Sequence, residues 1–455
     1  MNIGTINSIK VIFTITVLTF TSCSKEKKEM LSDPKKVLLE ELEHSFNKEL
    51  IDIWYPRVLD TTHGGFLSDF DHRWEPKGNH DKMIVTQARH VWTCAKVAAF
   101  SAEKAVLKSH ASHGFKFLKE SMWDPEHGGF YNLLDRQGNV KPDGQGNIIK
   151  NAYGNAFAIY GLAAYYGLSG EQEALELAKQ TFHWLEEHSY DSLHGGYFQF
   201  MQRDGTPLVS GYGNAPPKDQ NSTIHLLEAF TELYHAWPDD TLRERLSGLL
   251  VLIRDTITTD KGYMNLFFNR DWTPVSYRDS TAEIRAANYQ FDHVSFGHDV
   301  ETAFLLLEAS EALEIENNAE TLQKAKAMVD HALQNGWDTA SGGLYDQGYY
   351  FKEEEKITII KDTKVWWSQA ETLNTLLMMA DLFPDDEARY FEKFKILWDY
   401  TKTYLIDHEH GGWYWGGLDK EPEWKTGPKA QIWKVNYHTA RSMMHCIERL
   451  KINDQ

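Results

Sequence analysis

The tetrapeptide His127-Gly128-Gly129-Phe130 recurs along the whole chain with small changes, and this repeat decides the predicted fold. The other copies keep at least one glycine followed by an apolar residue. They are His63-Gly64-Gly65-Phe66, His194-Gly195-Gly196-Tyr197, Asp260-Lys261-Gly262-Tyr263, Ser341-Gly342-Gly343-Leu344 and His410-Gly411-Gly412-Trp413. Successive copies are 64 to 80 residues apart. Each repeat therefore has room for a pair of helices and their loops.

Apolar residues between these turns recur every three or four positions, which predicts helices. The clearest such segments are residues 85–100, 156–166, 222–234, 300–313 and 369–382. Alternation with a period of two is confined to short pieces after the glycines, such as 129–134, and predicts small β-hairpins in the connecting loops.

Six sequential helix pairs without a long linker favour one all-α domain, an (α/α)6 barrel in which six helix hairpins form a double ring. The glycines of the repeat have a role in this architecture, because a helix that ends and turns back favours a residue with positive φ. The histidines beside them are therefore interpreted as part of the turns rather than as ligands.

The composition is that of a large globular protein with an acidic surface. The chain has 455 residues, of which 42% are hydrophobic, and 66 acidic against 47 basic residues give a net charge of −19. Such a surface repels phosphate backbones, so no nucleic acid is expected as a partner. Cys94 and Cys446 lie within apolar helical patterns. They are predicted to be buried thiols rather than a disulfide or a metal site.

The first residues have the three parts of a signal sequence. Residues 1–10 carry one cation and no acid, residues 11–20 form a short apolar run, and Thr21 and Ser22 precede Cys23. The apolar run is too short to span a bilayer. A cysteine at this place resembles a bacterial lipobox, which implies cleavage before Cys23 and lipidation of its thiol.

This interpretation divides the chain into a lipoprotein signal peptide (1–22), a polar tether from the lipidated cysteine (23–33) and a single barrel domain (34–455). We expect the protein at the bacterial cell envelope, lipid-anchored at the periplasmic face or the outer membrane, and touching the membrane through its anchor alone. The alternative is a secreted or short-anchored protein with an incidental cysteine. The barrel is expected to be a monomer or a homodimer.

Histidines near predicted helix starts are the leading candidates for chemistry. His298 and Glu301 lie three residues apart in the string Ser295-Phe296-Gly297-His298-Asp299-Val300-Glu301. They share a helix face, so Glu301 is expected to hold one ring nitrogen of His298 and to leave the other as a base. His438 precedes Arg441 by three residues, and His225 lies in the first turn of another predicted helix. The alternative for each is a hydrogen-bonded core histidine.

An arginine and a tryptophan complete the candidate set. Arg89 lies in an apolar helical pattern, so its guanidinium group needs a partner, a ligand or a route to solvent. Trp367 and Glu371 lie four residues apart, which places a stacking plane beside a hydrogen-bond acceptor. Core packing with a carboxylate at a helix start remains the alternative for that pair.

Together these residues resemble the cellobiose 2-epimerases, which belong to the N-acylglucosamine 2-epimerase superfamily. The resemblance runs in the same order from about residue 38 to residue 450. Its strings are Gln87-Ala88-Arg89-His90-Val91-Trp92, residues 153–162, residues 221–234, Phe296-Gly297-His298-Asp299-Val300-Glu301, Trp366-Trp367-Ser368-Gln369-Ala370-Glu371, and Trp433-Lys434 with Tyr437-His438.

The resemblance implies an (α/α)6 barrel whose central cavity holds the functional side chains. It implies catalytic roles for His298, His438, His225 and Arg89. It implies substrate contacts for Glu301, Trp367, Glu371, Trp433, Tyr153, Asn221 and Phe304. This chain has Phe304 where some relatives have tryptophan, and Thr223 where cellobiose enzymes often have another histidine. Both differences are expected to change which substrate is preferred rather than the reaction that is catalysed.

The function implied is inversion at C2 of the reducing-end glucose or mannose of a disaccharide such as cellobiose or mannobiose, through ring opening and a cis-enediolate. His438 and His298 would exchange acid and base roles, Arg89 would stabilise the enediolate, and His225 would assist ring opening. No cofactor is expected. No set of histidine, cysteine and carboxylate has metal-site spacing, so no metal is expected either.

Three alternatives remain open at this point. Within the superfamily, the substrate is an N-acyl-D-glucosamine, or free mannose for an isomerase or epimerase. An (α/α)6 glycoside hydrolase would need two carboxyl groups flanking a glycosidic bond, whereas the sequence pairs histidines with single carboxylates. A non-catalytic glycan-binding lipoprotein would need the tryptophans but neither Arg89 nor the histidines.

Overall fold

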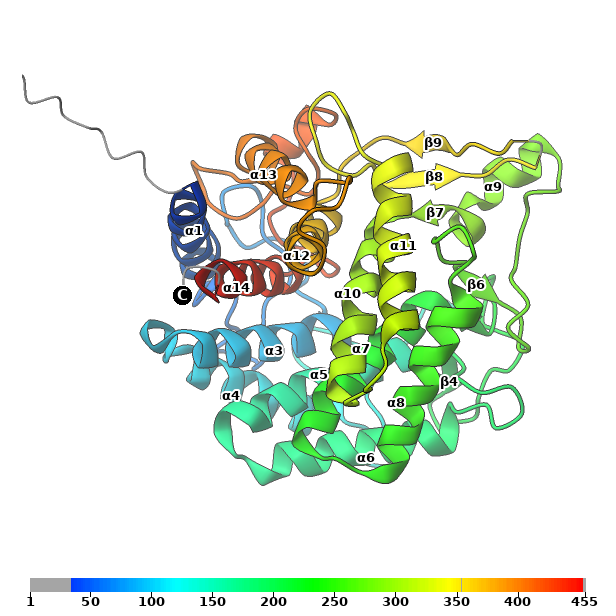
Figure 1. The fold of residues 1–455 in the computed structure, drawn as a ribbon. Coiled ribbons are helices and arrows are strands. Elements are labelled where there is room, and N and C mark those ends of the chain that lie inside the picture. Colours follow the sequence, from blue (N-terminus) through cyan, green and yellow to red (C-terminus); the bar gives the residue numbers. More distant parts are fainter. Residues whose placement is uncertain (1–33, 353, 453–455) are drawn as a thin grey trace, which may run out of the picture.

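The computed structural model describes residues 34–352 and 354–452, and this part of the chain is mostly helical with four small antiparallel sheets (Figure 1). The predicted signal peptide, Cys23 and most of the tether lie outside the described residues. None of the described helices combines the length and apolar character needed to cross a membrane. Cys94 and Cys446 are both buried free thiols, as predicted.

Six helices of 16 to 18 residues form the centre of the fold, and each contacts the next one along the chain. These inner helices are α3 (Ile84–Phe100), α5 (Ala152–Ser169), α7 (Gln220–Ala236), α10 (Phe296–Ala312), α12 (Trp366–Leu382) and α14 (Tyr437–Ile452). The last of them, α14, also contacts the first, α3, so the series of contacts returns to its start.

Each inner helix has an outer helix packed on it. In the same order the outer helices are α4 (Leu107–Phe117), α6 (Gln172–His188), α8 (Asp240–Leu252), α11 (Ala319–Asn335), α13 (Tyr390–Tyr400) and α1 (Pro34–His44). The N-terminal α1 therefore covers the C-terminal α14, and Figure 1 shows the blue and red helices side by side. The outer helices are more amphipathic, since they have one face on the ring and one in solvent.

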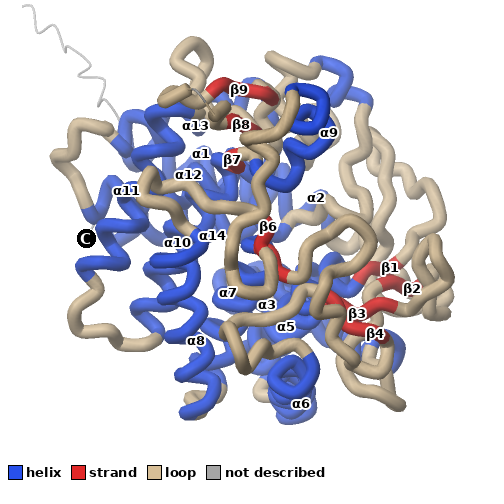
Figure 2. The backbone as a smooth tube through the Cα atoms, turned by 90° about the vertical axis from the view of Figure 1, so that its right-hand side faces the viewer, coloured by secondary structure: helices blue, strands red, loops and turns tan. Residues whose placement is uncertain are grey.

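The remaining elements are short. Two further helices are α2 (Asp52–Trp54) and α9 (Ala282–Asp292). The sheets pair β1 (Lys82–Met83) with β2 (Leu133–Leu134), β3 (Ile149–Asn151) with β4 (Phe200–Gln202), and β5 (Lys218–Asp219) with β6 (Phe267–Phe268), and join β7 (Val294–Ser295), β8 (Gln347–Tyr349) and β9 (Thr358–Lys361). In Figure 2, where the right-hand side of Figure 1 faces the viewer, the labelled strands are spread across this face, from β7, β8 and β9 at the top to β1, β2, β3 and β4 at the lower right.

The prediction of hairpins after each glycine pair is only partly right. A full hairpin forms after Gly342-Gly343, where β8 pairs with β9. After the other glycines the local pairing among the described residues is limited to single bridges, such as Leu134 with Val140. The strand itself pairs with the segment that precedes the inner helix of the previous repeat, as Lys82 does with Leu134. The pairing follows from the ring, because the start of one inner helix and the turn of the next repeat lie at the same end. The sheets thus join neighbouring repeats.

A buried ion pair fixes five of the six turns of the repeat. Gly128 and Gly129 have φ of 66° and 67°. Four residues before Gly128, Asp124 accepts a hydrogen bond at 3.0 Å from Lys150, which lies two residues before α5. Lys150 also donates to the carbonyl oxygen of Gly128. The equivalent pairs are Asp60 with Lys82, Asp191 with Lys218, Asp338 with Lys364 and Asp407 with Lys429.

The degenerate copy of the repeat has lost this pair. Thr258 and Val294 hold the two positions, and both are buried. Both side chains are neutral, and the Thr258 hydroxyl group lies 3.8 Å from the sulfur atom of Met328, so no charge is left uncompensated. This substitution of both partners together explains why the turn at Gly262 survives with a different sequence.

We expect Asp124→Asn to lower the free energy of unfolding by about 3–5 kcal/mol, since it leaves the Lys150 ammonium group buried without its carboxylate. Burial opposes ionisation of Asp124, but hydrogen bonds from Arg203 and Lys150 outweigh it and lower the pKa. Burial also lowers the pKa of Lys150, so desolvation of this cation offsets part of the gain. Urea unfolding at pH 7 measures the difference.

The pH dependence of this loss follows from the same shift. Because the carboxyl pKa is lower in the folded than in the unfolded chain, the stabilisation is present above about pH 4 and disappears as the pH falls below it. The exposed variant Asp204→Asn is the control and should leave the free energy of unfolding nearly unchanged. Equal stability of the Asp124→Asn protein and the parent at pH 7 would contradict the assignment.

Candidate active site

The starts of the inner helices bring their side chains to one cavity of about 370 Å³. Each inner helix contributes at least one residue from its first two turns, and two loops add a tryptophan each. The lining residues are Arg89, Tyr153, Asn221, His225, His298, Glu301, Trp366, Trp367, Trp415, Trp433 and His438. Their common position is explained by the ring, because helices that run in the same direction present equivalent turns to its axis.

His298 lies in the first turn of α10 with its Nδ1 atom 2.8 Å from Oγ of Ser295. The sequence-based expectation that Glu301 holds this ring is therefore not what the structure shows. The carboxylate of Glu301 accepts instead from Arg441 at 2.7 Å, because a permanent guanidinium is a stronger partner than a neutral imidazole. Burial lowers the pKa of His298 to about 3, so the ring is neutral at pH 7.

His438 lies in the first turn of α14 and faces a carboxylate from α12. Its Nδ1 atom is 2.7 Å from Oε1 of Glu371 and 3.6 Å from Oε1 of Glu301. Burial raises the pKa of Glu371 and lowers that of His438, so each charge is disfavoured unless the other is present. The contact fixes Nδ1 and leaves Nε2 of His438 as the atom that can exchange a proton.

Trp367 lies beside both of these histidines. Its ring centroid is 4.7 Å from that of His298 and 5.7 Å from that of His438. Both imidazoles therefore lie next to an aromatic plane suited to the apolar face of a sugar. Trp433 is 53% exposed and lies at the solvent side of the cavity.

His225 is held by its own helix, since its Nδ1 atom lies 2.8 Å from Oε2 of Glu228. Its ring packs against Tyr153 and Phe157 at centroid distances of 5.3 and 4.7 Å. Here the spacing of three residues does join a histidine to a carboxylate. Burial opposes ionisation of Glu228, but Arg441 and His225 outweigh it and lower its pKa to about 2.

Arg89 is a cation that lines the same cavity. Its Nη2 atom donates to the hydroxyl group of Tyr153 at 3.0 Å, and its guanidinium group lies over the rings of Phe157 and Tyr437 at 4.2 and 4.9 Å. The residue is 5% exposed, and Nε has no hydrogen-bond partner among the described residues. A buried cation with free donors is suited to an anionic oxygen in the cavity.

Arg441 joins the carboxylates beneath the histidines. Its Nη2 atom lies 2.7 Å from Oε1 of both Glu301 and Glu371, and its Nη1 atom donates to Oε1 of Glu228. The hydroxyl group of Tyr437 donates to the same oxygen of Glu228. One guanidinium thus connects the carboxylates that contact His225 and His438. We call Arg441, Glu228, Glu301 and Glu371 the arginine cluster.

Among the described residues, Glu301, Glu371 and His438 form a set with metal-ligand spacing, with ligand atoms within 4.8 Å of one another. The same carboxylate oxygens accept hydrogen bonds from Arg441, whose charge occupies the place of a cation. A second cation there would be repelled by this guanidinium. The donor set therefore fits an arginine better than a metal ion.

Nearly all of the predicted site residues meet at this cavity. Glu371 lies one layer below it, behind His438. Phe304 does not belong to the group, because it lies two turns farther along α10 than Gly297, packs on His445 at 5.1 Å and lines a different cavity. A side chain two turns along the helix lies out of reach of a ligand held at the helix starts.

Sequence reasoning missed the roles of Ser295, Glu228, Tyr437 and Arg441, and the lining positions of Trp366 and Trp415. Glu228 follows His225 by three residues, so the rule applied to Glu301 would also have marked it. Arg441 was noted three residues after His438, but not as the partner of three carboxylates. No local signal points to Trp415, which the loop after the last glycine pair brings to the cavity.

Comparison with known proteins gives a consistent family. Residues 64–442 match the family model described as N-acylglucosamine 2-epimerase (GlcNAc 2-epimerase). A cellobiose 2-epimerase of Bacteroides fragilis is 27% identical, over 91% of this chain and 99% of its own length. A D-mannose isomerase of Marinomonas mediterranea is 26% identical, over 88% and 93%. The solved cellobiose 2-epimerase from Bacillus thermoamylovorans superimposes with a TM-score of 0.78 at 25% identity, covering 91% of this chain and 100% of that one.

Proposed function

The chain belongs to the N-acylglucosamine 2-epimerase family, and on this premise we propose that it inverts C2 of the reducing-end glucose or mannose of a disaccharide such as cellobiose or mannobiose. It is a carbohydrate epimerase or isomerase by relationship. We assign the closed series of helix contacts to an (α/α)6 barrel. The histidine cavity at one end of this barrel is where the sugar would bind.

The observation that carries the proposal is the pair of histidines in one cavity, each with Nδ1 held and Nε2 available. Ser295 holds the ring of His298, and Glu371 holds that of His438. Inversion at carbon without a cofactor requires a base on one face of C2 and an acid on the other. Two imidazoles of fixed orientation meet this requirement in both directions of the reaction.

The proton transfers balance as follows. After ring opening exposes the C1 aldehyde, one imidazole takes the C2 proton and the C–H electron pair forms the C1–C2 double bond of a cis-enediolate. The negative charge moves to the C1 oxygen, where Arg89 neutralises it. The other imidazole then donates a proton from Nε2 to the opposite face of C2, and the C1 carbonyl re-forms. When this ring is His438, Glu371 replaces the proton through Nδ1. His225 is placed to assist ring opening by proton exchange with O1 or the ring oxygen.

The arginine cluster supports this exchange. When Nε2 of His438 accepts a proton, the new positive charge lies beside Glu371 at 2.7 Å. The carboxylate therefore stabilises the imidazolium that the reaction forms, while Arg441 holds Glu371 in place. Burial raises the pKa of Glu371 and lowers that of His438, so neither group holds its charge well without the other, and the proton that His438 exchanges stays within this pair.

The site argues against the hydrolase alternative. Of the three carboxylates near the histidines, only Glu301 lines the cavity, and its Oε1 atom is engaged by Arg441. Inverting hydrolysis needs two carboxyl groups about 6.5–9.5 Å apart across the bond. A glycan-binding protein without turnover would have no use for the buried histidine and carboxylate pairs.

A product analysis by NMR tests the function. The purified protein is incubated separately with cellobiose, mannobiose, mannose and N-acetylglucosamine. We expect the C2 epimer of the disaccharide, with the same mass and an intact glycosidic bond. The D-mannose isomerase relative favours one second candidate, conversion of free mannose to a ketose, which the same spectra distinguish by the loss of the aldose C1 signal. Shortened sugars would contradict the proposal.

We also propose that the mature protein begins at Cys23 and is anchored by lipid at that residue, at the bacterial cell envelope. The support is the charged, apolar and small-residue order of residues 1–22. Expression in a bacterium with labelled palmitate should label the parent protein and leave the Cys23→Ser variant unlabelled. Label on both proteins, or on neither, would reject the anchor.

A further inference from the structure

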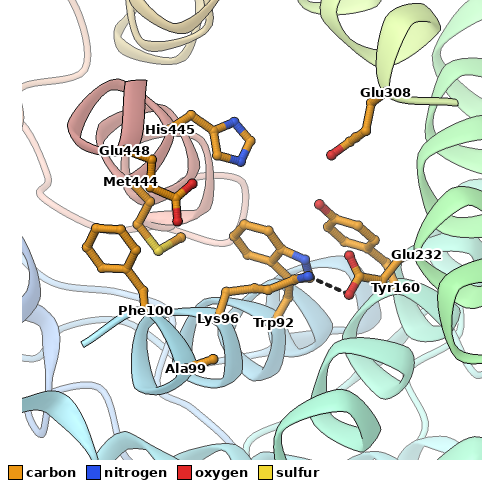
Figure 3. Close-up of a pocket in the computed structure, with 10 residues that line it drawn as sticks. All are labelled: Trp92, Lys96, Ala99, Phe100, Tyr160, Glu232, Glu308, Met444, His445 and Glu448. Atoms are coloured by element: carbon orange, nitrogen blue, oxygen red, sulfur yellow. Dashed lines mark ion pairs between the residues drawn. The ribbon is translucent and has the colours of Figure 1, made fainter. Parts of the chain in front are cut away.

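A second cavity of about 300 Å³ lies toward the other ends of the inner helices, and it shares no lining residue with the histidine cavity. Figure 3 shows its side chains, which come from five of the six inner helices. They are Trp92, Lys96, Ala99, Phe100, Tyr160, Glu232, Glu308, Met444, His445 and Glu448. We call this space the far cavity. Nothing in the proposed reaction uses it.

Trp92 gives the far cavity a donor without an acceptor. The residue is 2% exposed, and its Nε1 atom has no hydrogen-bond partner among the described residues. Its ring stacks on Tyr160 at 5.1 Å with an angle of 13° between the planes. Figure 3 shows the indole nitrogen on the side of the ring that faces Lys96 and Glu232. A buried indole N–H normally finds a partner, so the cavity is built for an acceptor at this point.

The other polar groups of the far cavity are mostly acceptors. Glu232 pairs with Lys96 at 2.6 Å. Glu308 lies across the space in Figure 3, and burial raises its pKa to about 7 although Arg441 opposes the shift. Burial lowers the pKa of His445 to about 3, so this ring is neutral, and its Nδ1 atom has no partner among the described residues.

These groups together select the ligand. A carboxylate ligand would satisfy Trp92 but would be repelled by Glu232 and Glu308. A protonated amine would donate to the glutamates, but an ammonium group has no lone pair to accept a hydrogen bond from the indole N–H. A hydroxyl group both accepts and donates, so a molecule with several hydroxyl groups satisfies every one of these side chains. The stacked aromatic rings and a volume of about 300 Å³ fit a molecule of monosaccharide size.

We propose that the far cavity is a second sugar site, which binds a neutral monosaccharide or polyol through Trp92, Glu308 and Glu232. A wider cavity of about 680 Å³ adjoins it and shares Glu308, His445 and Glu448. The site is therefore open to a longer sugar along that side. Because no lining residue is shared with the histidine cavity, binding at one site is measurable when the other is disabled.

The experiment uses the full chain with ¹⁵N-labelled tryptophan and follows the indole N–H signals by NMR. The Trp92 signal is assigned by its loss in Trp92→Phe. Titration with D-mannose, D-glucose or xylitol should shift this signal saturably. Glu308→Ala should weaken the response of Trp92 at least tenfold, whereas Glu320→Ala on an outer helix should not change it. Glu308 forms no ion pair with any other residue that the structure describes, so its removal breaks none there.

Two further experiments test which class of ligand binds and whether the far cavity binds it independently of the histidine cavity. Butylammonium and acetate at the same concentration should leave the Trp92 signal unmoved. In His438→Asn the Trp92 response to sugar should persist, and signals of Trp367 and Trp433 report the histidine cavity separately. The proposal is wrong if sugars up to 100 mM leave Trp92 unmoved, if butylammonium or acetate shifts it, or if its response is lost with His438.

Discussion

His438→Asn is expected to lower kcat about 10³-fold or more, because it removes the group that exchanges the C2 proton while filling the same space. The side-chain amide still reaches the carboxylate of Glu371, so the fold should be kept. Steady-state kinetics with the preferred disaccharide measure the loss, and the helical circular dichroism spectrum should match that of the parent. His298→Asn is expected to have an effect of the same order.

The matched control lies on the same helix. His445 is seven residues after His438, two turns farther along α14, and lines the far cavity rather than the histidine cavity. His445→Asn should therefore keep kcat within a few-fold of the parent. A normal kcat for His438→Asn, or equal losses in both variants, would remove the histidine from the mechanism.

If the two histidines act in this way, the activity should not fall at mildly acidic pH. A base must be neutral to act, and burial lowers the pKa of His298 to about 3, so protonation of this ring does not compete near pH 6. The acidic limb of kcat/KM should lie below about pH 5 rather than near the ordinary histidine pKa of about 6.5. Ser295→Ala removes the partner of Nδ1 and should lower kcat without changing stability appreciably.

Arg441→Met is expected to lower the free energy of unfolding by about 3–5 kcal/mol, at least as much as Asp124→Asn, or to prevent folding at 37 °C. The guanidinium group is 1% exposed and is the shared partner of Glu228, Glu301 and Glu371, which are themselves almost completely buried. Methionine has a similar volume but leaves these carboxylates without their cation. Urea unfolding at pH 7 measures the change.

Arg441→Lys separates charge from geometry. Lysine keeps the cation but cannot donate to opposite sides of the cluster from one planar group, so an intermediate stability is expected, together with a lower kcat through the misplaced Glu371. Arg449→Met is the control on the same helix, since Arg449 is partly exposed and pairs with Asp381 at 3.3 Å. If Arg441→Met were as stable as Arg449→Met, the arginine cluster would not hold the ring together.

The sequence was sufficient to predict the repeat because its cause is local. Five of the six turns contain a glycine pair with positive φ and the sixth contains Gly262, and the helix pattern between the turns is strong, so six units follow from spacing alone. The ion pair within each turn was not visible in that reasoning. Asp124 and Lys150 are 26 residues apart and meet only because a strand and a turn share one end of the ring.

The site shows the same division between local and distant contacts. The spacing of His225 and Glu228 corresponds to a real contact, because both lie in one helix and no stronger partner competes for the second carboxylate oxygen. The same spacing does not produce a contact between His298 and Glu301, because the guanidinium group of Arg441 on α14 pairs with Glu301 instead. Which carboxylate meets which cation depends on helix packing, and a single sequence does not contain that information.

The sequence also did not predict how far along its helix each residue lies from the histidine cavity. Phe304 lies on the predicted helix and matches a position of the family, but it is six residues after His298. At about 1.5 Å per residue this places it roughly 9 Å farther down the helix. It lines the wider cavity of about 680 Å³ that adjoins the far cavity, and no pattern in the sequence predicts a pocket there.

The most direct test of the central claim is epimerisation in deuterated water. Two imidazoles on opposite faces of C2 require that the proton removed and the proton returned are different, and that the second comes from solvent. The epimer formed in the first turnover should carry one deuterium, at C2 of the reducing-end sugar, by NMR and mass spectrometry. An epimer without deuterium at C2 would contradict the account.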